Sequence, residues 1–458
     1  MRDMPPLVSG NIDLLRGHPS TRLLATSQIA DAAAVVLNAP SLPVDSYTVI
    51  RHPLHYASEM GNRDVRGEIA RWAGERYGLR EEIGLERILM TSGASFGLMN
   101  VLMHCTSPVT GYTKQAFLIS PAYFLAAKVF EDAGFTNKLT AISSTATSID
   151  LPSLRRHLHH LNATTPDIPL SAGLVPISHD GAAPKRIYKY VLYCVPTYSN
   201  PTGQTWDLAT RRELVQLARE FDVLLVSDDV YDFLGNEGDK CALGEDGRLL
   251  PRLVTVDREI MEEEGELEQG AGFTVSNCSF SKLLGPGLRC GWIETATSVL
   301  AEQIGHGGAN ISGGNSSHFV STLIHHVVKT RAIDAIITTL RQTYTSRSGA
   351  IAAAIRAHLP AGTEICGGHG GFFMWVGLPP GYDARKIVRM AEEQGEEGGG
   401  VRVMSGDMTE CPGERNRMGW GDRWVRITVS YCEEEEAVEG VRRLGAAVER
   451  WRAGPGCL

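Results

Sequence analysis

Short apolar segments alternate with longer amphipathic segments through the first two thirds of the chain. Strand-like length and apolar content occur in six segments, 86–92, 115–120, 188–196, 223–228, 252–256 and 273–279. Helical spacing of apolar residues occurs in three others, 95–105, 122–134 and 208–221. Strand and helix in succession predict a mostly parallel sheet that is sandwiched by helices. The predicted fold class is therefore α/β.

The pattern changes near residue 317. Long helical segments cover 318–359, and a strand (370–378), a helix (383–394), a second strand (424–431) and a last charged helix follow. This succession predicts a smaller α+β C-terminal domain, with the glycine-rich segment 305–315 as a hinge. The acidic segment 257–270 is expected to be a solvated insertion between strands. The expected division is an N-terminal arm with part of the small domain at 1–45, a large domain at 46–305 and a small domain at 306–458.

Net charge, hydropathy and cysteine content exclude several classes of binding partner and indicate a cellular location. A net charge of −9 argues against general binding to nucleic acid or to anionic membranes, both of which demand a basic surface. The sequence holds no run of about 18 apolar residues, the usual minimum for a membrane helix. Nine cysteines without a CxxC pair indicate reduced thiols and a cytoplasmic protein. No metal site is predicted, and the histidines of RHLHHL (His157, His159, His160) are expected on an exposed helix or loop.

Four short segments follow predicted strands, where open α/β sheets bind their ligands. Each also has an ordinary structural explanation. TSGAS (91–95) can hold a phosphate at a helix N-terminus or simply cap that helix. SPAYF carries Tyr123, either a stacking ring or a core tyrosine, and NPTG places Asn200 in a tight turn. SDDVY places Asp228 and Tyr231 after an apolar strand, where a carboxylate needs a cation or hydrogen bonds.

The fifth segment is SFSKLLGPGLRCGWI (279–293). Lys282 follows a buried strand, so desolvation is expected to lower its pKa and to suit it to a Schiff base with an aldehyde. Ser279 and Ser281 offer hydroxyls, and Arg289 offers a guanidinium suited to a phosphate. A flat, phosphorylated aromatic aldehyde whose ring nitrogen pairs with a carboxylate is pyridoxal 5'-phosphate. The five segments together predict that cofactor.

In this order, NPTG, DDVY, SFSK and GLRCGW resemble the fold-type I aminotransferases of class I and II, over most of the chain from GHPS near 17 to VRITVSY near 430. LLRGHPS and SDDVYDFL are similar to the group that contains 2-aminoadipate and kynurenine aminotransferases and fungal relatives. The resemblance implies transfer of an amino group from an L-amino acid to a 2-oxo acid, with pyridoxal phosphate held covalently on Lys282.

The resemblance also implies individual roles. Lys282 is the cofactor anchor and the acid/base, Asp228 pairs with the ring nitrogen, and Tyr123 stacks on the ring. Asn200 and Tyr231 bind the phenolic oxygen, and the phosphate is held by Ala94, Ser95, Ser279 and Arg289. Arg426 binds the substrate carboxylate, with Gly17 and Asn200 beside it. Tyr56 reaches the phosphate of a neighbouring subunit, which implies a homodimer with shared active sites.

Two departures from the family pattern leave the substrate open. Phe96 follows Ser95 where relatives often have a glutamine or a hydroxyl residue, and the segment 403–424 is longer than in most relatives. The same fold also hosts enzymes that eliminate or replace a β or γ substituent, including carbon–sulfur lyases and cyclopropane-forming synthases. A ligand-binding regulator without catalysis is a third alternative, but about 45 residues precede PLHYASEMG, without a basic recognition helix.

Overall fold

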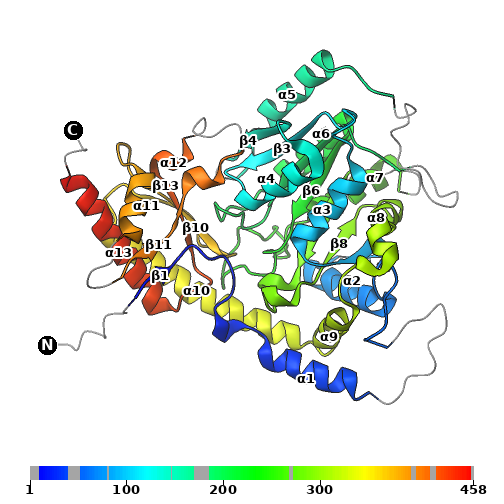
Figure 1. Ribbon diagram of the computed structural model, residues 1–458, viewed down its shortest axis with the longest axis horizontal. Coiled ribbons are helices and arrows are strands. Elements are labelled where there is room, and N and C mark those ends of the chain that lie inside the picture. The colour runs from blue at the N-terminus through cyan, green and yellow to red at the C-terminus, as the bar shows by residue number, and fades with distance from the viewer. Residues whose placement is uncertain are drawn as a thin grey trace.

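Two sheets organise the protein. The computed structural model describes residues 10–39, 52–79, 82–145, 147–169, 185–267, 272–393, 399–412 and 419–454. Within them a seven-stranded sheet forms the larger part, and a four-stranded sheet lies toward the C-terminus (Figure 1). None of the helices in these residues is long and apolar enough to cross a membrane.

The large sheet has the strand order β2-β8-β7-β6-β5-β3-β4. Its strands are β2 (Ile88–Thr91), β3 (Gln115–Ser120), β4 (Leu139–Ser143), β5 (Tyr190–Cys194), β6 (Val223–Asp228), β7 (Thr274–Ser279) and β8 (Gly291–Thr295). Every neighbouring pair is parallel except those that β8 makes with β2 and β7. The predicted mostly parallel sheet is confirmed.

Helices cover both faces of this sheet. Phe117 and Ile119 of β3 join one apolar cluster, together with residues of α5 (Leu151–Thr164), α6 (Leu208–Phe221) and α7 (Leu253–Glu264). The alternate residues Ala116 and Leu118 join the other cluster, which includes α3 (Ala94–Cys105) and α4 (Phe124–Phe130). This alternation is the two-residue period of a strand that is buried on both sides. Strands such as β6 and β7 are therefore buried along their whole length.

The remaining helices of the larger part lie at one edge of the sheet. Both α2 (Arg63–Tyr77) and α8 (Ser298–Gly305) contact β2, and α1 (Thr26–Leu37) packs on α9 (His318–Lys329) (Figure 1). Asn62 caps α2 by accepting hydrogen bonds from the backbone N–H of Asp64 and Val65.

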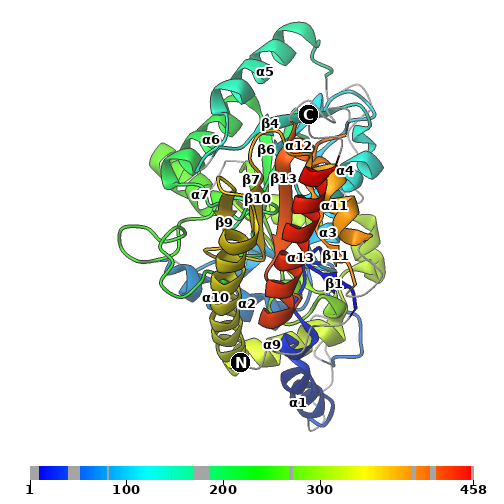
Figure 2. The ribbon, with the colours of Figure 1, turned by 90° about the vertical axis from the view of Figure 1, so that its left-hand side faces the viewer.

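The smaller sheet is antiparallel, with the order β12-β13-β10-β9. Its strands are β9 (Glu364–Gly367), β10 (Phe373–Gly377), β12 (Met404–Ser405) and β13 (Trp424–Thr428), and its helices are α10 (Ala332–His358), α11 (Ala384–Glu392), α12 (Trp420–Arg423) and α13 (Glu434–Ala453). Figure 2 shows α10 and α13 side by side over this part of the molecule. The N-terminal strand β1 (Ile12–Asp13) pairs in parallel with β11 (Val401–Arg402), so the start of the chain lies against the C-terminal part.

Two expectations for residues 252–270 are wrong. The segment 252–256 is not a strand, because Leu253–Glu264 forms the helix α7. Its β-branched residues suggested a strand, but Leu253, Val256 and Ile260 pack into one cluster at helical spacing. Residues 257–264 are not an insertion either, because they belong to α7; Asp257 is buried and accepts a hydrogen bond from the Phe273 N–H at 2.7 Å, whereas the glutamates at 259 and 262–264 are exposed, as predicted. Residues 268–270 lie outside the described residues.

The histidine cluster lies where the sequence predicted. His157, His159 and His160 belong to α5, and the last two are exposed. The glycine-rich segment 305–315 connects α8 to the α9 region and includes a π-type turn at Asn310–Gly314. Its role as a hinge stays a prediction.

The fold contains a buried ion pair that predicts a stability effect. Arg252 is 1% exposed and donates to Glu294 Oε2 at 2.5 Å and to Ser276 Oγ at 3.0 Å. Breaking a buried pair costs up to roughly 3–5 kcal/mol, and loss of Arg252 would leave the buried Glu294 with Arg87 alone, whose Nη1 donates to Oε1 at 3.3 Å. We expect Arg252→Met to lower the unfolding temperature by several degrees in scanning calorimetry.

The matched control is Arg212→Met, which breaks the exposed pair between Arg212 and Glu263. An exposed pair contributes at most about 1 kcal/mol, so this variant should unfold close to the unmodified protein. Equal unfolding temperatures for the two variants would contradict a stabilising role for the buried pair.

Candidate active site

One cavity collects side chains from both parts of the molecule. It has a volume of about 290 Å³, and it lies at the carboxyl ends of β5, β6 and β7, where parallel sheets bind ligands. The small sheet contributes Phe373 and Arg426, and the N-terminal segment contributes Leu15, Arg16 and Gly17. The lining includes every predicted site residue except Tyr56, namely Gly17, Ala94, Ser95, Tyr123, Asn200, Asp228, Tyr231, Ser279, Lys282, Arg289 and Arg426.

Lys282 ends the short 3-10 turn Phe280–Lys282, directly after β7. Its Nζ donates a hydrogen bond to the Gly17 carbonyl at 2.8 Å and lies 5.3 Å from the centre of the Phe372 ring. Burial lowers the pKa of this amine to about 8, against the opposing attraction of Asp228. Much more of this amine than of an ordinary lysine is therefore neutral, and nucleophilic, near neutral pH.

Asp228 ends β6 at the floor of the cavity. The Tyr193 hydroxyl donates to its Oδ2 at 2.7 Å, whereas its buried Oδ1 has no hydrogen-bond partner among the described residues. Burial raises the pKa of the carboxyl to about 6, and the Tyr193 hydrogen bond opposes that rise. A buried carboxylate with one open oxygen requires a cationic or hydrogen-bonding partner, and a protonated ring nitrogen is such a partner.

A second group of residues forms an anion cradle. Arg289 donates to the Ser92 carbonyl at 3.0 Å, and Ser281 lies between it and Ser279, whose hydroxyl donates to Ser281 Oγ at 2.9 Å. The helix α3 begins here without a side-chain cap, so its first N–H groups suit an anion. Gly93 has φ +90°, and a Cβ there would lie 2.5 Å from Arg289 Nη2, so glycine is required for this approach.

Arg426 of β13 is the cation on the small-sheet side. It is 3% exposed, and its guanidinium donates to Asn200 Oδ1 at 2.9 Å and to the Leu15 carbonyl at 2.5 Å. It also lies 4.1 Å from the centre of the Phe373 ring. Burial lowers the pKa of this group to about 10. None of its contacts in the described residues is an ion pair, so it retains the capacity to bind a carboxylate.

The aromatic residues and Gly17 complete the lining. Burial, reinforced by Asp228, raises the pKa of Tyr123 to about 12, and burial also raises the pKa of Tyr231, which a hydrogen bond with Asn200 partly offsets. Both tyrosines are therefore neutral hydrogen-bonding groups. A Cβ on Gly17 would lie 2.5 Å from Phe373 Cζ, so the absence of a side chain lets the N-terminal segment close over the cavity.

Tyr56 lies elsewhere. Its side chain is 75% exposed and approaches Gly313, where an added Cβ would lie 2.7 Å from its ring. It does not line the cavity of its own chain. The expectation that it acts in a neighbouring subunit therefore stays a prediction.

Sequence reasoning did not select several residues that shape the site. These are Gly93, Tyr193, Asn277 and Phe373. Tyr193 lies within β5 and Asn277 within β7, not in the segments that follow those strands, and Phe373 is 91 residues beyond Lys282, so neither local spacing nor motif context marked them. Gly93 lies inside the motif TSGAS, so the motif itself could have marked it, and Ser281, whose hydroxyl the sequence did single out, lies in the cavity as expected.

Comparison with known proteins gives a consistent result. Residues 51–444 match the family model described as "Aminotransferase class I and II". An uncharacterized protein of Saccharomyces cerevisiae, YER152C, is 35% identical and covers 95% of this chain and 96% of its own. A 2-aminoadipate transaminase of Thermus thermophilus is 25% identical, covering 96% and 90%. The kynurenine aminotransferase of Pyrococcus horikoshii, solved with PMP, has a TM-score of 0.72 at 22% identity, covering 96% and 91%.

The lowered pKa of Lys282 predicts its reactivity toward an acylating reagent. Only the neutral amine reacts, so in cofactor-free protein its labelling by trace acetic anhydride should be half-maximal near pH 8. At pH 7 roughly a tenth of the amine would be neutral, far more than for an ordinary lysine with a pKa near 10.4. Peptide mapping by mass spectrometry measures the labelling, with Nα-acetyl-lysine amide as the internal reference. A profile that parallels this reference would contradict the desolvation argument.

Proposed function

We infer the roles of the cavity residues from one premise, which is that this chain belongs to the class I and II aminotransferases. It is a transaminase that uses pyridoxal 5'-phosphate to move an amino group between amino acids and 2-oxo acids. Its structural neighbours have the fold-type I architecture. The family and the named relatives do not favour the lyase alternative. Loss of catalysis in a binding protein is not favoured either, because Lys282 is present.

The observation that carries the assignment is the convergence of Lys282, Asp228 and an anion cradle on one cavity. We propose that Arg289, Ser279, Ser281 and the start of α3, including Ala94 and Ser95, hold the cofactor phosphate. Asp228 Oδ1 then holds a proton on the ring nitrogen, and Asn200 and Tyr231 bind the phenolic oxygen. Tyr123 supports the ring face. When bound, the cofactor withdraws electrons from Cα of the amino acid and so makes its proton acidic.

Lys282 and Arg426 act on the substrate in this proposal. Arg426 binds the α-carboxylate in place of some of its present contacts, with Asn200 and the Gly17 segment beside it. This anchoring fixes Cα within reach of Lys282. The neutral Lys282 amine would take the proton from Cα of the substrate and return it to C4' of the cofactor. Its lowered pKa supports this role.

We propose that the donor carries a large apolar or aromatic side chain. The cavity-lining residues that bind neither the cofactor nor the α-carboxylate in this proposal are mainly apolar. They include Leu15, Leu98, Phe124, Leu125 and Val129. Arg16 is the cavity's remaining cation in the described residues. Asp13 already neutralises it, with a carboxylate oxygen 3.0 Å from its Nε, and Nη1 donates to the Tyr431 hydroxyl. The same Asp13 oxygen also lies 3.6 Å from Arg402 Nη1, and a second carboxylate on the substrate would have to compete with Asp13 for Arg16.

Absorbance of the cofactor-loaded protein tests both the reaction and the donor class. Single amino acids are added without an oxo acid, and conversion of the cofactor to its amine form is followed together with the 2-oxo acid product. We expect phenylalanine, tyrosine or leucine to react about tenfold or more faster than glutamate or 2-aminoadipate, because a second carboxylate is poorly solvated in this cavity. Release of ammonia or a thiol with recovery of the original spectrum would overturn transamination.

The variant Asp13→Asn separates the donor proposal from the reaction itself. It keeps a side-chain oxygen for the Leu15 and Arg16 N–H groups but removes the charge that neutralises Arg16. Dicarboxylic donors should gain relative to apolar ones in this variant. A donor ranking that does not change would contradict the role given to the Asp13–Arg16 pair.

We further propose a homodimer with shared sites. Tyr56 projects from the surface beside other exposed apolar side chains, Leu54 and Ile311, and a monomer seldom leaves such groups clustered without function. In a two-fold dimer Tyr56 of one subunit would reach the phosphate cradle of the other, which lacks a tyrosine hydroxyl beside Arg289 in the described residues.

Subunit complementation tests this sharing. We expect Lys282→Ala and Tyr56→Ala each to be impaired as pure dimers. A hybrid that carries one variant per subunit, purified with two affinity tags, should regain about half the unmodified activity, because one of its two sites is intact. A hybrid no more active than the mean of the two pure variants would show that Tyr56 does not act across the interface.

The compartment is also a proposal. The eight cysteines in the described residues form no disulfide with one another, and Cys457 lies outside those residues. Unbridged thiols, six of them buried in the apolar clusters, support a reducing, cytoplasmic location.

A further inference from the structure

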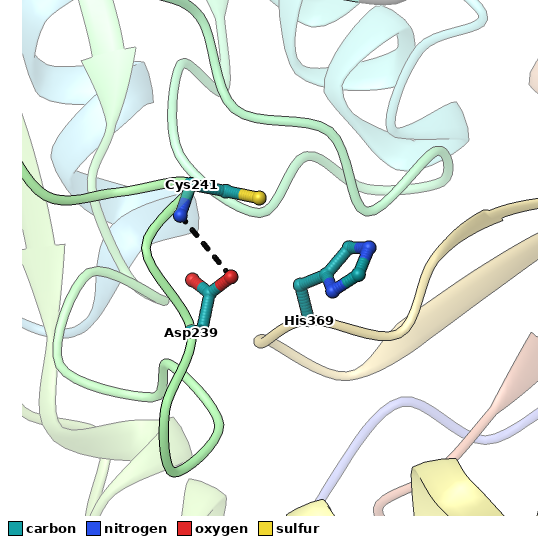
Figure 3. A group of neighbouring side chains, drawn as sticks. All are labelled: Asp239, Cys241 and His369. Carbon is teal, nitrogen blue, oxygen red and sulfur yellow. Dashed lines mark hydrogen bonds between the residues drawn. The ribbon is translucent and has the colours of Figure 1, made fainter.

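Three side chains of metal-binding type meet outside the active-site cavity. Asp239 and Cys241 belong to the loop between β6 and α7, and His369 lies in the turn between β9 and β10. Their ligand atoms all lie within 4.8 Å of one another. Figure 3 shows the three side chains facing one another across the space between the two loops. None of them lines the active-site cavity, so the mechanism above leaves them without a role.

Backbone hydrogen bonds fix the two loops against each other. The Asn236 N–H donates to the His369 carbonyl at 2.8 Å, and the Asn236 side chain donates to the Gly368 carbonyl at 2.7 Å. Close by, the Gly371 N–H donates to the Leu234 carbonyl at 2.9 Å. These bonds, none of which involves a side chain of Asp239, Cys241 or His369, hold the turn of His369 against the start of the loop that carries Asp239 and Cys241. Only side-chain rotation is needed to bring their ligand atoms together.

The Asp239 carboxylate is already oriented. The Tyr198 hydroxyl donates to Oδ2 at 2.8 Å, and the Cys241 N–H donates to Oδ1 at 3.1 Å. Tyr198 is itself held in place by close approach to Gly370 and Gly371. Hydrogen bonds of this kind around a carboxylate are the arrangement that orients ligands in metal sites, and each oxygen keeps a lone pair for a cation.

We propose that Asp239, Cys241 and His369 bind one divalent transition-metal ion of the zinc type, with water as the fourth ligand. A sulfur and an imidazole nitrogen select Zn²⁺ over Mg²⁺ or Ca²⁺, which prefer oxygen ligands. On binding, the Cys241 thiol gives its proton to solvent and the sulfur forms the bond to the metal, so the site gains a ligand and releases one proton. The sequence predicted no metal site, because its ligands are separated by 128 residues and belong to different parts of the fold.

The position of the site predicts what the metal does. The loop that carries Asp239 and Cys241 follows the large sheet, whereas His369 precedes β10 of the small sheet. The metal would join these two parts through side chains, next to the segment that leads to Phe373, which packs against Gly17 and under Arg426. Metal binding therefore favours one relative position of the two parts and should stabilise the folded state.

Calorimetric titration of the cofactor-loaded enzyme with Zn²⁺, after removal of metal with a chelator, tests the proposal. We expect one ion per chain, and X-ray absorption at the zinc edge should show one sulfur neighbour at about 2.3 Å. Cys241→Ser and His369→Ala should each weaken binding at least tenfold, and the thermal stabilisation by Zn²⁺ should disappear with it. Both residues are exposed, so circular dichroism should show an unchanged fold.

Matched controls are Cys366→Ser, a thiol on the neighbouring strand β9, and His160→Ala, an exposed histidine on α5. Both should bind Zn²⁺ like the unmodified enzyme. Undiminished binding in Cys241→Ser and His369→Ala, or a zinc spectrum without a sulfur neighbour, would overturn the proposal. Failure to bind Zn²⁺ at micromolar concentration would overturn it as well. None of these readouts depends on which reaction the active site performs.

Discussion

The buried carboxylate of Asp228 is the constraint on which the active site depends. It ends β6 between the strands that carry Tyr193 and Asn277, and one of its oxygens faces the cavity without a partner in the described residues. Beneath it, Asp229 accepts hydrogen bonds from Ser227 and Ser276, and Arg252 donates to Ser276. The Asp229 carboxylate is thus hydrogen-bonded within the sheet, whereas Asp228 Oδ1 remains without a partner in the described residues at the cavity. A carboxylate placed there favours a ligand with positive charge on its facing atom.

The positions of Lys282 and Arg426 depend on the N-terminal segment, which contacts both side chains. Lys282 donates to the Gly17 carbonyl and Arg426 donates to the Leu15 carbonyl, so these two cations of the cavity are held by the N-terminal segment. That segment is in turn fixed through β1, which pairs with β11. Arg426 and Lys282 are therefore both held by the same segment of the chain. A change in the N-terminal segment is expected to affect both.

Features that follow from a few adjacent residues could be predicted from the sequence. Features formed by residues far apart in the sequence could not. Apolar runs and motif order predicted the parallel sheet, Lys282 after β7 and Asp228 after β6, because each follows from a few adjacent residues. The helix α7 was missed, since Leu253, Val254 and Val256 carry a strand-like composition that tertiary packing overrides. Tyr193, Phe373 and the cluster of Asp239, Cys241 and His369 arise from strands and loops far apart in sequence, and no local pattern marks them.

The state of the ring nitrogen tests the account most directly. Holoenzyme prepared with cofactor labelled with ¹⁵N in its ring can be followed by NMR as the pH is raised. If Asp228 holds a proton on that nitrogen, its chemical shift should stay that of the protonated form well above the pH at which the free cofactor loses the proton, and Asp228→Asn should abolish this. A nitrogen that titrates as in free solution in the unmodified enzyme would contradict the role assigned to Asp228.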